Sequence, residues 1–321
     1  MSGLTPRVDV DLTRAVEALG GLRDACPDAV VHYRVAANDS PRLLTAFAEA
    51  GCAFDVRSAE ELRAVVHRGV AGDRILSSHP VSTRAALAQA AGAGVRGFVV
   101  DSLAEVAKLA EVAPGGGVLV RLLASGSRCP SERRKFGCPA DLAPDLLLRA
   151  ASCGLQPRGV SVPAGWAATE AAVRTVDEVR SRAAALGIDL AVVHVDDVRA
   201  GAALPARGLA GSSALWVSAG HSLAAPGGVL VASVVAVVER AGRRWVHLDG
   251  IAATESVEIR TTRSGPVVPS VLAGPADAGD DVLFAAHAVA LPAALREGDH
   301  VRFTHAGPRP WSRPIEERVT A

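Results

Sequence analysis

Short runs of β-branched and aliphatic residues alternate with longer amphipathic stretches between residues 30 and 220. The intervening stretches, such as SPRLLTAFAEAG and SAEELRAVVHRG, carry apolar residues at helical spacing and end in glycine, which predicts helices. The predicted strands are Val30–Ala37, Cys52–Val56, Arg74–Ser78, Gly97–Asp101, Val118–Leu123, Arg158–Val162, Leu190–Val195 and Ala214–Ser218. Eight strands with intervening helices favour a (β/α)8 barrel of the TIM type, and a doubly wound open sheet is the competing fold.

The pattern changes after Gly220 to strand-like runs separated by turn residues, among them VLVASVVAVVER, RRWVHLD and HVRFTH. We therefore predict two domains in an α/β chain. The barrel covers residues 11–220 and begins with a helix over residues 11–25. A C-terminal all-β domain, β-barrel-like in character, covers residues 221–321 together with residues 1–10. The connection over residues 198–212 is rich in Gly and Pro, so we expect a loop there.

Composition narrows the class of protein. Lysine plus arginine and aspartate plus glutamate both number 34, so the net charge is zero and a nucleic-acid partner is not expected. The uncharged stretch Gly208–Val238 is interrupted by Pro226, Gly227 and Gly228, which predicts strand, turn and strand rather than a membrane span. Five scattered cysteines without a CxxC pair, and no secretory pattern at the N-terminus, predict a cytoplasmic protein with reduced thiols.

Several segments together carry a family resemblance. They include VVHYRVAANDSPRLLTAFAEAGCAFDVRSAEELRAVVHRGV near the start, RILSSHP, GFVVDSLAEVAKL, KFG at Lys135–Gly137, GVSVPAG at 159–165 and APGGVLVASV at 225–234. Over nearly its whole length the chain resembles the fold-type III pyridoxal-phosphate decarboxylases, which act on ornithine, arginine and diaminopimelate. The resemblance implies a barrel followed by a β-domain, and dimers whose sites form across the subunit interface.

The resemblance also implies cofactor-binding residues that differ in this chain. Ala36 stands where the family's Schiff-base lysine is implied, and the ring-stacking histidine falls within Pro163-Ala164-Gly165-Trp166. The glycine-rich phosphate loop falls at residues 194–198, where Asp196 and Asp197 would repel a phosphate. The remaining departures fall at Ala225-Pro226-Gly227-Gly228, at Asp277 and near Arg309. From these six departures we predict that pyridoxal phosphate is lost and that no cofactor is bound, with a metal left open.

Only two lysines are present, and neither is expected to replace the missing one. Lys108 lies on the exposed side of a predicted helix, and Lys135 is predicted to form a loop ion pair. Arginine stays protonated near neutral pH and does not form imines. Any Schiff-base chemistry would therefore need Lys108 or Lys135.

The candidate catalytic residues are polar groups on barrel strands. Arg34 is expected to share the inward face of its strand with His32 and Ala36, and to pair with Asp55, because an unpaired guanidinium inside a barrel is costly. The pair is either a structural plug or a ligand clamp. His194, Asp196 and Asp197 end the seventh strand, at the face where active sites of this fold lie. Their His-x-Asp spacing suits proton transfer or metal ligation, and a polar strand terminus is the structural alternative.

Further residues are predicted to line the same mouth and to bind substrate: His79, Trp166, His221, Asp277 and Arg309. Asp277 and Asp281 would come from the other subunit, as the resemblance implies. Trp166 and Trp216 are expected to line an apolar pocket. The basic loop RCPSERRKFGC places Cys129 and Cys138 near arginines, and a flexible loop over the mouth is the alternative to a nucleophilic thiol.

Three functional hypotheses follow. The first is a repurposed, pyridoxal-phosphate-independent enzyme or binder that takes an amino-acid-derived or anionic metabolite in the former cofactor cavity. If it is an enzyme, we expect a lyase of the decarboxylase type. The second is a non-catalytic pseudoenzyme that regulates a partner through its dimer surface. The third is an amino-acid decarboxylase that uses pyridoxal phosphate. The expected assembly is a homodimer, and a heteromer with an active relative is the alternative.

Overall fold

The computed structural model describes residues 4–124, 135–198, 208–251, 258–276, 282–308 and 316–320. Two compact units are present: Leu19–Ser222, and Met1–Ala18 together with Leu223–Ala321. The division falls within the first helix, α1 (Leu12–Ala25), whereas the sequence analysis assigned that helix wholly to the barrel. In the described part of the chain, no helix is long and apolar enough to cross a membrane.

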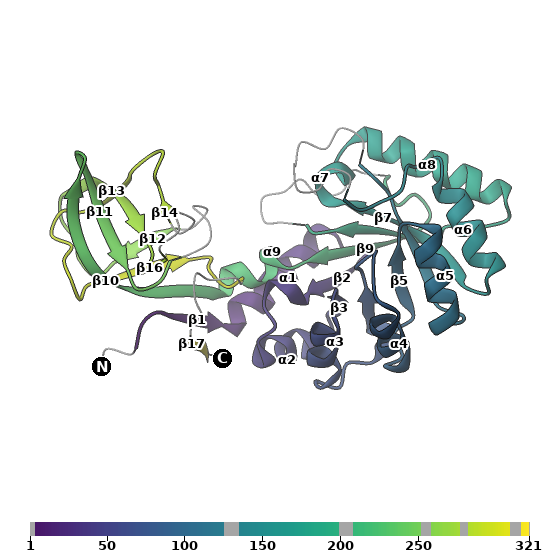
Figure 1. Ribbon diagram of the computed structural model, residues 1–321, viewed down its shortest axis with the longest axis horizontal. Helices are drawn as coiled ribbons and strands as arrows, with labels where there is room; N and C mark the ends of the chain where they lie inside the picture. The colour runs from purple at the N-terminus through teal and green to yellow at the C-terminus, as the bar shows by residue number, and fades with distance from the viewer. Residues whose placement is uncertain are drawn as a thin grey trace. The chain divides into compact units, whose positions relative to one another are not determined.

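The first unit is a closed barrel of eight parallel strands (Figure 1). The order around the barrel follows the sequence and closes where the first strand pairs with the last. The strands are β2 (Ala29–Arg34), β3 (Ala53–Val56), β4 (Ile75–Ser77), β5 (Gly97–Val100), β6 (Gly117–Arg121), β7 (Gln156–Pro163), β8 (Val192–Asp196) and β9 (Ala214–Ala219). The predicted (β/α)8 barrel is therefore confirmed, and the open sheet is excluded.

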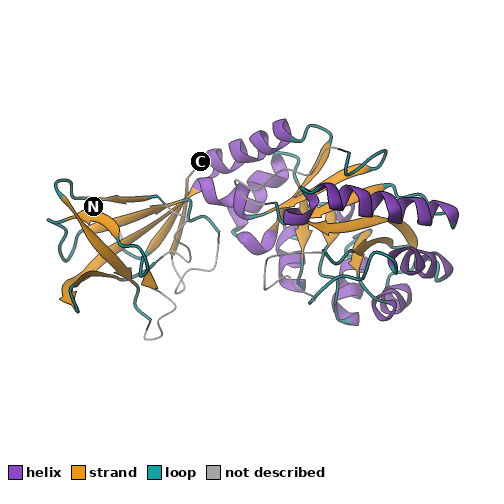
Figure 2. Cartoon of the chain, turned by 90° about the horizontal axis from the view of Figure 1, so that it is seen from above, coloured by secondary structure: helices purple, strands orange, loops and turns teal. Residues whose placement is uncertain are grey.

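Helices cover the outside of these strands (Figure 2). They are α2 (Pro41–Glu49), α3 (Ala59–Val66), α4 (Arg84–Gly92), α5 (Leu103–Val112), α6 (Ala143–Ser152), α7 (Ala164–Ala167) and α8 (Glu170–Ala185), with 3-10 turns η1 (Val35–Ala37) and η2 (Gly72–Arg74). Four begin at a Ser or Thr whose hydroxyl accepts a backbone N–H of the first turn, namely Ser58, Thr83, Ser102 and Thr169. These caps satisfy amides that the helix itself leaves unpaired.

Strand β2 ends at Arg34, earlier than the sequence analysis expected. Ala36 lies in η1 and is exposed, so it is not on the inward face of the strand. The backbone turns into a 3-10 helix after Arg34, and the alternation of inward and outward side chains ends there. His32 and Arg34 are buried inward-facing residues, as predicted.

The second unit is built around a nine-stranded sheet. Its strands are β1 (Arg7–Asp11), β10 (Gly228–Arg240), β11 (Arg243–Leu248), β12 (Ile259–Thr261), β13 (Val267–Ala273), β14 (Val282–Leu283), β15 (Val289–Pro292), β16 (His300–Thr304) and β17 (Glu316–Thr320). The short helix α9 (His221–Ala224) and the turn η3 (Ala225–Gly227) precede β10. As predicted, Arg7–Val10 joins this unit: β1 pairs antiparallel with β10 and parallel with β17. A core that includes Leu230, Val246, Leu272 and Phe303 fills it.

One close approach within the barrel requires glycine. A Cβ atom on Gly159 would lie 1.7 Å from the carbonyl oxygen of Val192, its partner in the β7–β8 pair. We expect Gly159→Ala to lower the free energy of unfolding by about 1–3 kcal/mol, because the two strands must separate. Gly165→Ala is the matched control, since nothing lies within 4 Å of its added methyl group. Urea denaturation of both variants tests this, and equal stabilities would contradict it.

Candidate functional site

Side chains from alternate strand positions fill the barrel interior in three layers. The amino-terminal layer is apolar and contains Leu76, Val99, Leu119 and Val192 packed with Trp216. The middle layer contains imidazoles and hydroxyls: His32, Ser161, His194 and Ser218. The layer at the carboxyl ends of the strands is ionic. We expected Trp216 to line an apolar pocket with Trp166, but its partly buried ring packs against the amino-terminal layer, 5.0 Å from the ring of His32.

Six charged residues form the ionic layer, which we call the mouth cluster: Arg34, Asp55, Arg57, Arg121, Asp196 and Asp197. They come from strands β2, β3, β6 and β8 or from the residues that directly follow them. With three arginines and three aspartates, the cluster is electrically balanced. Its deepest member, Asp55, has a fully buried side chain.

Arg34 pairs with Asp55, as the sequence analysis predicted. Its Nη2 lies 3.1 Å and its Nε 3.3 Å from Asp55 Oδ2. The same guanidinium contacts Asp196 and reaches Asp197, with 3.4 Å between Nη1 and Oδ1. The hydroxyl of Ser78 donates to the other oxygen of Asp55. Arg34 is only 7% exposed, so its charge is compensated almost entirely by these carboxylates.

Asp196 is the centre of the cluster, because all three arginines contact it. Its Oδ2 lies 2.7 Å from Arg121 Nη1 and 3.1 Å from Arg57 Nη2, while Oδ1 contacts Arg34. Arg57 also donates from Nε to the Ser78 hydroxyl, at 3.3 Å. Its side chain is 31% exposed, against 9% for Arg34 and 14% for Arg121. Arg57 is thus the arginine of the cluster that solvent reaches most easily.

Local backbone geometry brings the strand ends together. Asp197 adopts φ 65°, a left-handed conformation that aspartate tolerates better than most residues, directly after β8. Gly220 follows β9, and a Cβ atom there would lie 2.8 Å from the Cβ of Ala37 and 3.1 Å from that of Arg34. Glycine at this position lets the end of β9 approach the end of β2, which carries Arg34.

The electrostatics favour a charged Asp55. Burial alone would raise the pKa of its carboxyl, but the charges of Arg34 and Arg57 and the Ser78 hydroxyl together lower that pKa well below its usual range. Burial, followed by the neighbouring Arg34 charge, lowers the pKa of Arg57. Burial raises the pKa of Glu61, whose carboxylate accepts the backbone N–H of Arg57 at 2.8 Å.

His194 does not form the predicted proton-transfer pair with Asp196. It shares the inward side of β8 with Asp196, but its Nδ1 lies 2.9 Å from the Ser161 hydroxyl and its Nε2 2.8 Å from the Ser218 hydroxyl. Burial lowers the pKa of His194 well below its ordinary value, and burial lowers that of His32 to about 4. Both imidazoles are therefore neutral near pH 7, and His194 acts as a hydrogen-bonded spacer beneath the charges.

The residues Asp55, His194 and Asp196 meet one criterion for a metal site. One potential ligand atom from each lies within 4.8 Å of the others. However, both nitrogens of His194 are engaged by serines, and arginines contact both carboxylates. A divalent cation would face three guanidinium groups, so the donor set does not fit a metal.

The structure describes only three of the five predicted substrate-binding residues. His79 is half-buried, with its ring 5.2 Å from that of Phe136. Trp166 is 7% exposed on α7, and its Nε1 has no hydrogen-bond partner among the described residues. His221 is exposed at the start of α9. The predicted residues Asp277 and Arg309 lie outside the described residues, as do Asp281 and Cys129.

Cys138 is not a good nucleophile in this structure. It is 4% exposed, and burial, together with nearby Asp101, raises the pKa of its thiol to about 12. The thiol therefore stays protonated near neutral pH. The basic residues of the loop suggested a reactive thiol, but the backbone of Cys138 forms an isolated β-bridge with Leu122, directly after β6.

Two arginines of the cluster were missed from the sequence. Arg57 stands two residues after Asp55, and Arg121 is the last residue of β6. Because the carboxyl ends of all parallel barrel strands meet at one face, charged residues at strand ends were the available signal. We applied that signal to the end of β8 alone. Arg34 was predicted from the alternation of side chains along β2, and Asp55 on β3 as its charge partner.

Comparisons with known proteins identify the family. The model "Pyridoxal-dependent decarboxylase, pyridoxal binding domain" matches residues 12–196. This chain belongs to the pyridoxal-dependent decarboxylase family. It is 28% identical to the lysine/ornithine decarboxylase of Selenomonas ruminantium over 339 residues, which covers 94% of this chain and 84% of that protein. It is 30% identical to the ornithine decarboxylase of Candida albicans over 164 residues, 50% of this chain and 35% of that protein.

Solved structures agree with this assignment. The crystal structure of lysine decarboxylase from Selenomonas ruminantium matches with a TM-score of 0.82 at 26% identity, over 98% of this chain and 92% of that one. The viral arginine decarboxylase of Paramecium bursaria Chlorella virus shares the fold, with a TM-score of 0.84 at 20% identity over 99% and 96% of the two chains.

The comparisons contradict the expectation that no cofactor is bound. The matched family model is the pyridoxal-binding domain itself. A further matching structure, 26% identical to this chain with a TM-score of 0.83 over 98% of this chain and 90% of that one, is a complex with pyridoxal phosphate and cadaverine. The family therefore points to pyridoxal phosphate, and the replaced residues did not justify excluding it.

The described side chains do not fit a covalently held pyridoxal phosphate. Ala36 offers no amine at the position where the family resemblance implies a lysine. Lys108 lies on α5, where its Nζ pairs with Glu105 at 2.5 Å and donates to the Ser82 carbonyl oxygen at 2.6 Å. Lys135 is exposed, with its Nζ 5.0 Å from the Phe136 ring centroid. The arginines of the mouth cluster are already paired with its three aspartates, and Arg57 is the one whose side chain is most exposed.

Removing Arg34 should destabilise the protein. Arg34→Met leaves the carboxylates of Asp55 and Asp196 buried with fewer cations, so we expect the free energy of unfolding to fall by about 3–5 kcal/mol. Arg63→Met removes an exposed pair with Glu60 and should cost less than about 1 kcal/mol. Urea denaturation measures both. If the free energy of unfolding falls no further in Arg34→Met than in Arg63→Met, Arg34 is not a structural plug.

Stability should fall as the pH drops below about 6.5. The folded-state pKa values of His32 and His194 lie below the ordinary value, so the unfolded chain binds more protons than the folded chain in this range. Each imidazole then removes up to about 1.4 kcal/mol per pH unit, for His32 until the pH nears about 4. His32→Gln should reduce this slope by about 1.4 kcal/mol per pH unit, the contribution of one proton. Denaturation at a series of pH values tests it, and an unchanged slope would contradict the assignment.

Proposed function

We propose that this chain binds pyridoxal phosphate, or an amino-acid-derived metabolite that bears a phosphate or a carboxylate, non-covalently at the mouth cluster. The family membership supports the ligand class, and the comparisons favour the decarboxylase hypothesis over a pyridoxal-phosphate-independent enzyme. The side chains support the non-covalent mode, because three arginines converge on Asp196 while neither lysine lies on a barrel strand.

The single observation that carries this proposal is the arrangement around Arg57. Arg34 has Asp55 and Asp197 as partners besides Asp196, whereas the ion pair that Arg57 forms within the described residues is with Asp196, which it shares. Arg57 is also the most exposed arginine of the cluster. An incoming anion can therefore bind the accessible side of Arg57 without breaking the buried Arg34–Asp55 pair. Charge-assisted bonds of this kind are the strongest available to a phosphate or a carboxylate.

A non-catalytic protein with a plugged barrel is the second candidate. The equal number of arginines and aspartates in the mouth cluster favours it, because the charges are already compensated without a ligand. Such a protein would act through its surface. The homodimer, the heteromer with an active relative and the cytoplasmic location all stay predictions.

Pyridoxamine phosphate is the probe that separates these candidates, because it carries the phosphate and ring but has no aldehyde to react with lysines. Equilibrium dialysis should show that it binds and that pyridoxamine, which lacks the phosphate, binds at least about tenfold more weakly. Arg57→Gln should weaken binding of the phosphate compound by about ten- to a hundredfold, since it removes a charged hydrogen-bond donor. Arg84→Gln is the control, because Arg84 lies outside the mouth cluster and forms an exposed ion pair with Glu111. This variant should leave the binding of pyridoxamine phosphate unchanged.

Absence of binding by the folded wild-type protein would reject the proposal and favour the plugged barrel. Equal binding of the two probes would reject the role of the phosphate. A separate titration with pyridoxal phosphate and borohydride tests the covalent alternative: stoichiometric modification of Lys108 or Lys135 would show that the cofactor is held covalently after all.

A further inference from the structure

A second buried cation lies in the β-domain. Arg244 is the second residue of β11 and is 9% exposed. Its Nη1 donates to the Ser270 hydroxyl at 2.7 Å, and its Nη2 donates to the carbonyl oxygens of Pro292, Ala293 and Leu295 at 3.2–3.5 Å. All of these acceptors are neutral, and Arg244 forms no ion pair with a carboxylate in the described part of the chain.

This arrangement differs from that of Arg34. The guanidinium of Arg34 contacts three carboxylates, whereas that of Arg244, which is buried to a similar degree, forms its hydrogen bonds within the described residues to neutral groups. A buried charge without a counter-charge is costly, even when its hydrogen bonds are made. An anion beside Arg244 would supply the missing compensation.

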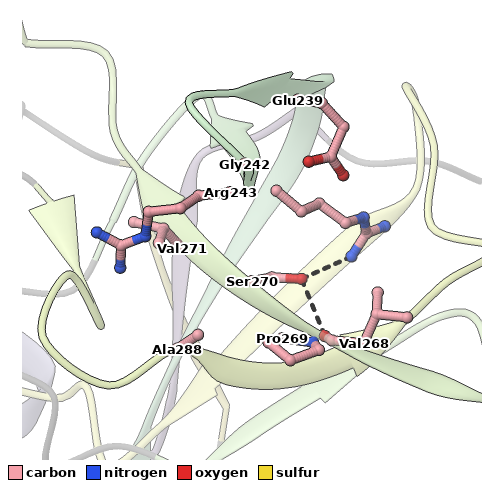
Figure 3. Close-up of a pocket in the computed structure, with 9 residues that line it drawn as sticks. Glu239, Gly242, Arg243, Val268, Pro269, Ser270, Val271 and Ala288 are labelled. Atoms are coloured by element: carbon pink, nitrogen blue, oxygen red, sulfur yellow. Dashed lines mark hydrogen bonds between the residues drawn. The ribbon is translucent and has the colours of Figure 1, made fainter.

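A cavity of about 340 Å³ lies beside this arginine, a volume near the low end for small-molecule sites. The residues that line it are Glu239, Gly242, Arg243, Arg244, Val268, Pro269, Ser270, Val271 and Ala288 (Figure 3). The dashed lines in Figure 3 mark the chain of hydrogen bonds from Arg244 to Ser270 and from Ser270 to the Val268 carbonyl oxygen.

The sheet register explains why the cavity is open. The pairing of β11 with β13 begins at Arg244, which lies opposite Ser270. Before Arg244, the chain leaves β11 for the β10–β11 turn at Ala241 and Gly242. Residues 267–269 of β13 therefore extend past the start of β11, with β15 as their strand partner. The cavity lies where a continuing strand would otherwise be.

The residues that line the cavity include an acidic side chain, basic side chains and apolar side chains. Glu239 pairs across the β10–β11 ladder with Arg244, so one carboxylate and one buried guanidinium border the same cavity. Figure 3 shows the Glu239 carboxylate at the edge of the cavity. Val268, Pro269, Val271 and Ala288 provide the apolar part of the lining. A ligand that satisfies all three parts carries a carboxylate, an ammonium group and a short aliphatic body.

We propose that this cavity binds a small aliphatic α-amino acid, with its carboxylate on Arg244 and its ammonium group on Glu239. The site lies in the β-domain and does not depend on the function proposed for the barrel mouth. A bound amino acid would compensate the charge of Arg244 and place its side chain against the aliphatic wall.

Ligand-observed NMR titrations with three probes test each contact: L-valine, isovalerate, which lacks the ammonium group, and isobutylamine, which lacks the carboxylate. L-valine should bind the wild-type protein, isovalerate should bind more weakly and isobutylamine should not bind. Glu239→Gln should weaken the binding of L-valine by about two- to fivefold, the effect of one exposed charge, and leave the binding of isovalerate unchanged. Arg260→Gln, which removes the exposed partner of Glu258 in the same domain, is the matched control and should change neither affinity.

Arg244→Met should abolish binding of both carboxylates in a protein whose circular dichroism shows that it is folded. If Arg244→Met does not fold, the affinities of Glu239→Gln for the two carboxylate probes, compared with those of the wild-type protein, test the proposal. Absence of L-valine binding by the wild-type protein would overturn the proposal, as would an equal loss of affinity for L-valine and isovalerate in Glu239→Gln. The variant Arg57→Gln should still bind L-valine, so a failure at the barrel mouth is distinguishable from a failure here.

Discussion

The carboxylate of Asp196, contacted by three arginines, is the interaction on which the barrel mouth depends. A charge inside a barrel has little water to solvate it, so each buried ion needs a partner of opposite sign within a few ångströms. Asp196 joins Arg34, Arg57 and Arg121, and Arg34 in turn holds Asp55 and Asp197. The neutral imidazole and hydroxyl layer beneath supports the charges, and the apolar layer below it closes the barrel.

The fold followed from the sequence because its signals are local and repeated. Eight aliphatic runs, most of them followed by an amphipathic segment, are hard to place in any other closed arrangement. The Arg34–Asp55 pair also followed, since a buried guanidinium requires a carboxylate and Asp55 is on the neighbouring strand. The roles of Arg57 and Arg121 could not be predicted, because both contact Asp196 only through the closure of the barrel, which brings the strand ends together.

Other errors have a similar origin. Ala36 was expected to continue the alternation of β2, but the chain turns into a 3-10 helix after Arg34, and periodicity does not reveal where a strand stops. His194 was expected to transfer protons, but serines on the two neighbouring strands occupy both of its nitrogens. The absence of a cofactor was inferred from replaced residues, whereas the family model that matches this chain is the pyridoxal-binding domain. Replacement of the attachment residue bears on how a ligand is held and not on whether one binds.

A double-mutant cycle between Arg34 and Asp196 tests the central claim most directly. The free energies of unfolding of Arg34→Met, Asp196→Asn and the double variant would be measured under one set of conditions. If the mouth cluster is a coupled network, the double variant should be more stable than the sum of the single losses predicts, with a coupling energy of about 2–3 kcal/mol. Additive losses, within about 0.5 kcal/mol, would contradict the account.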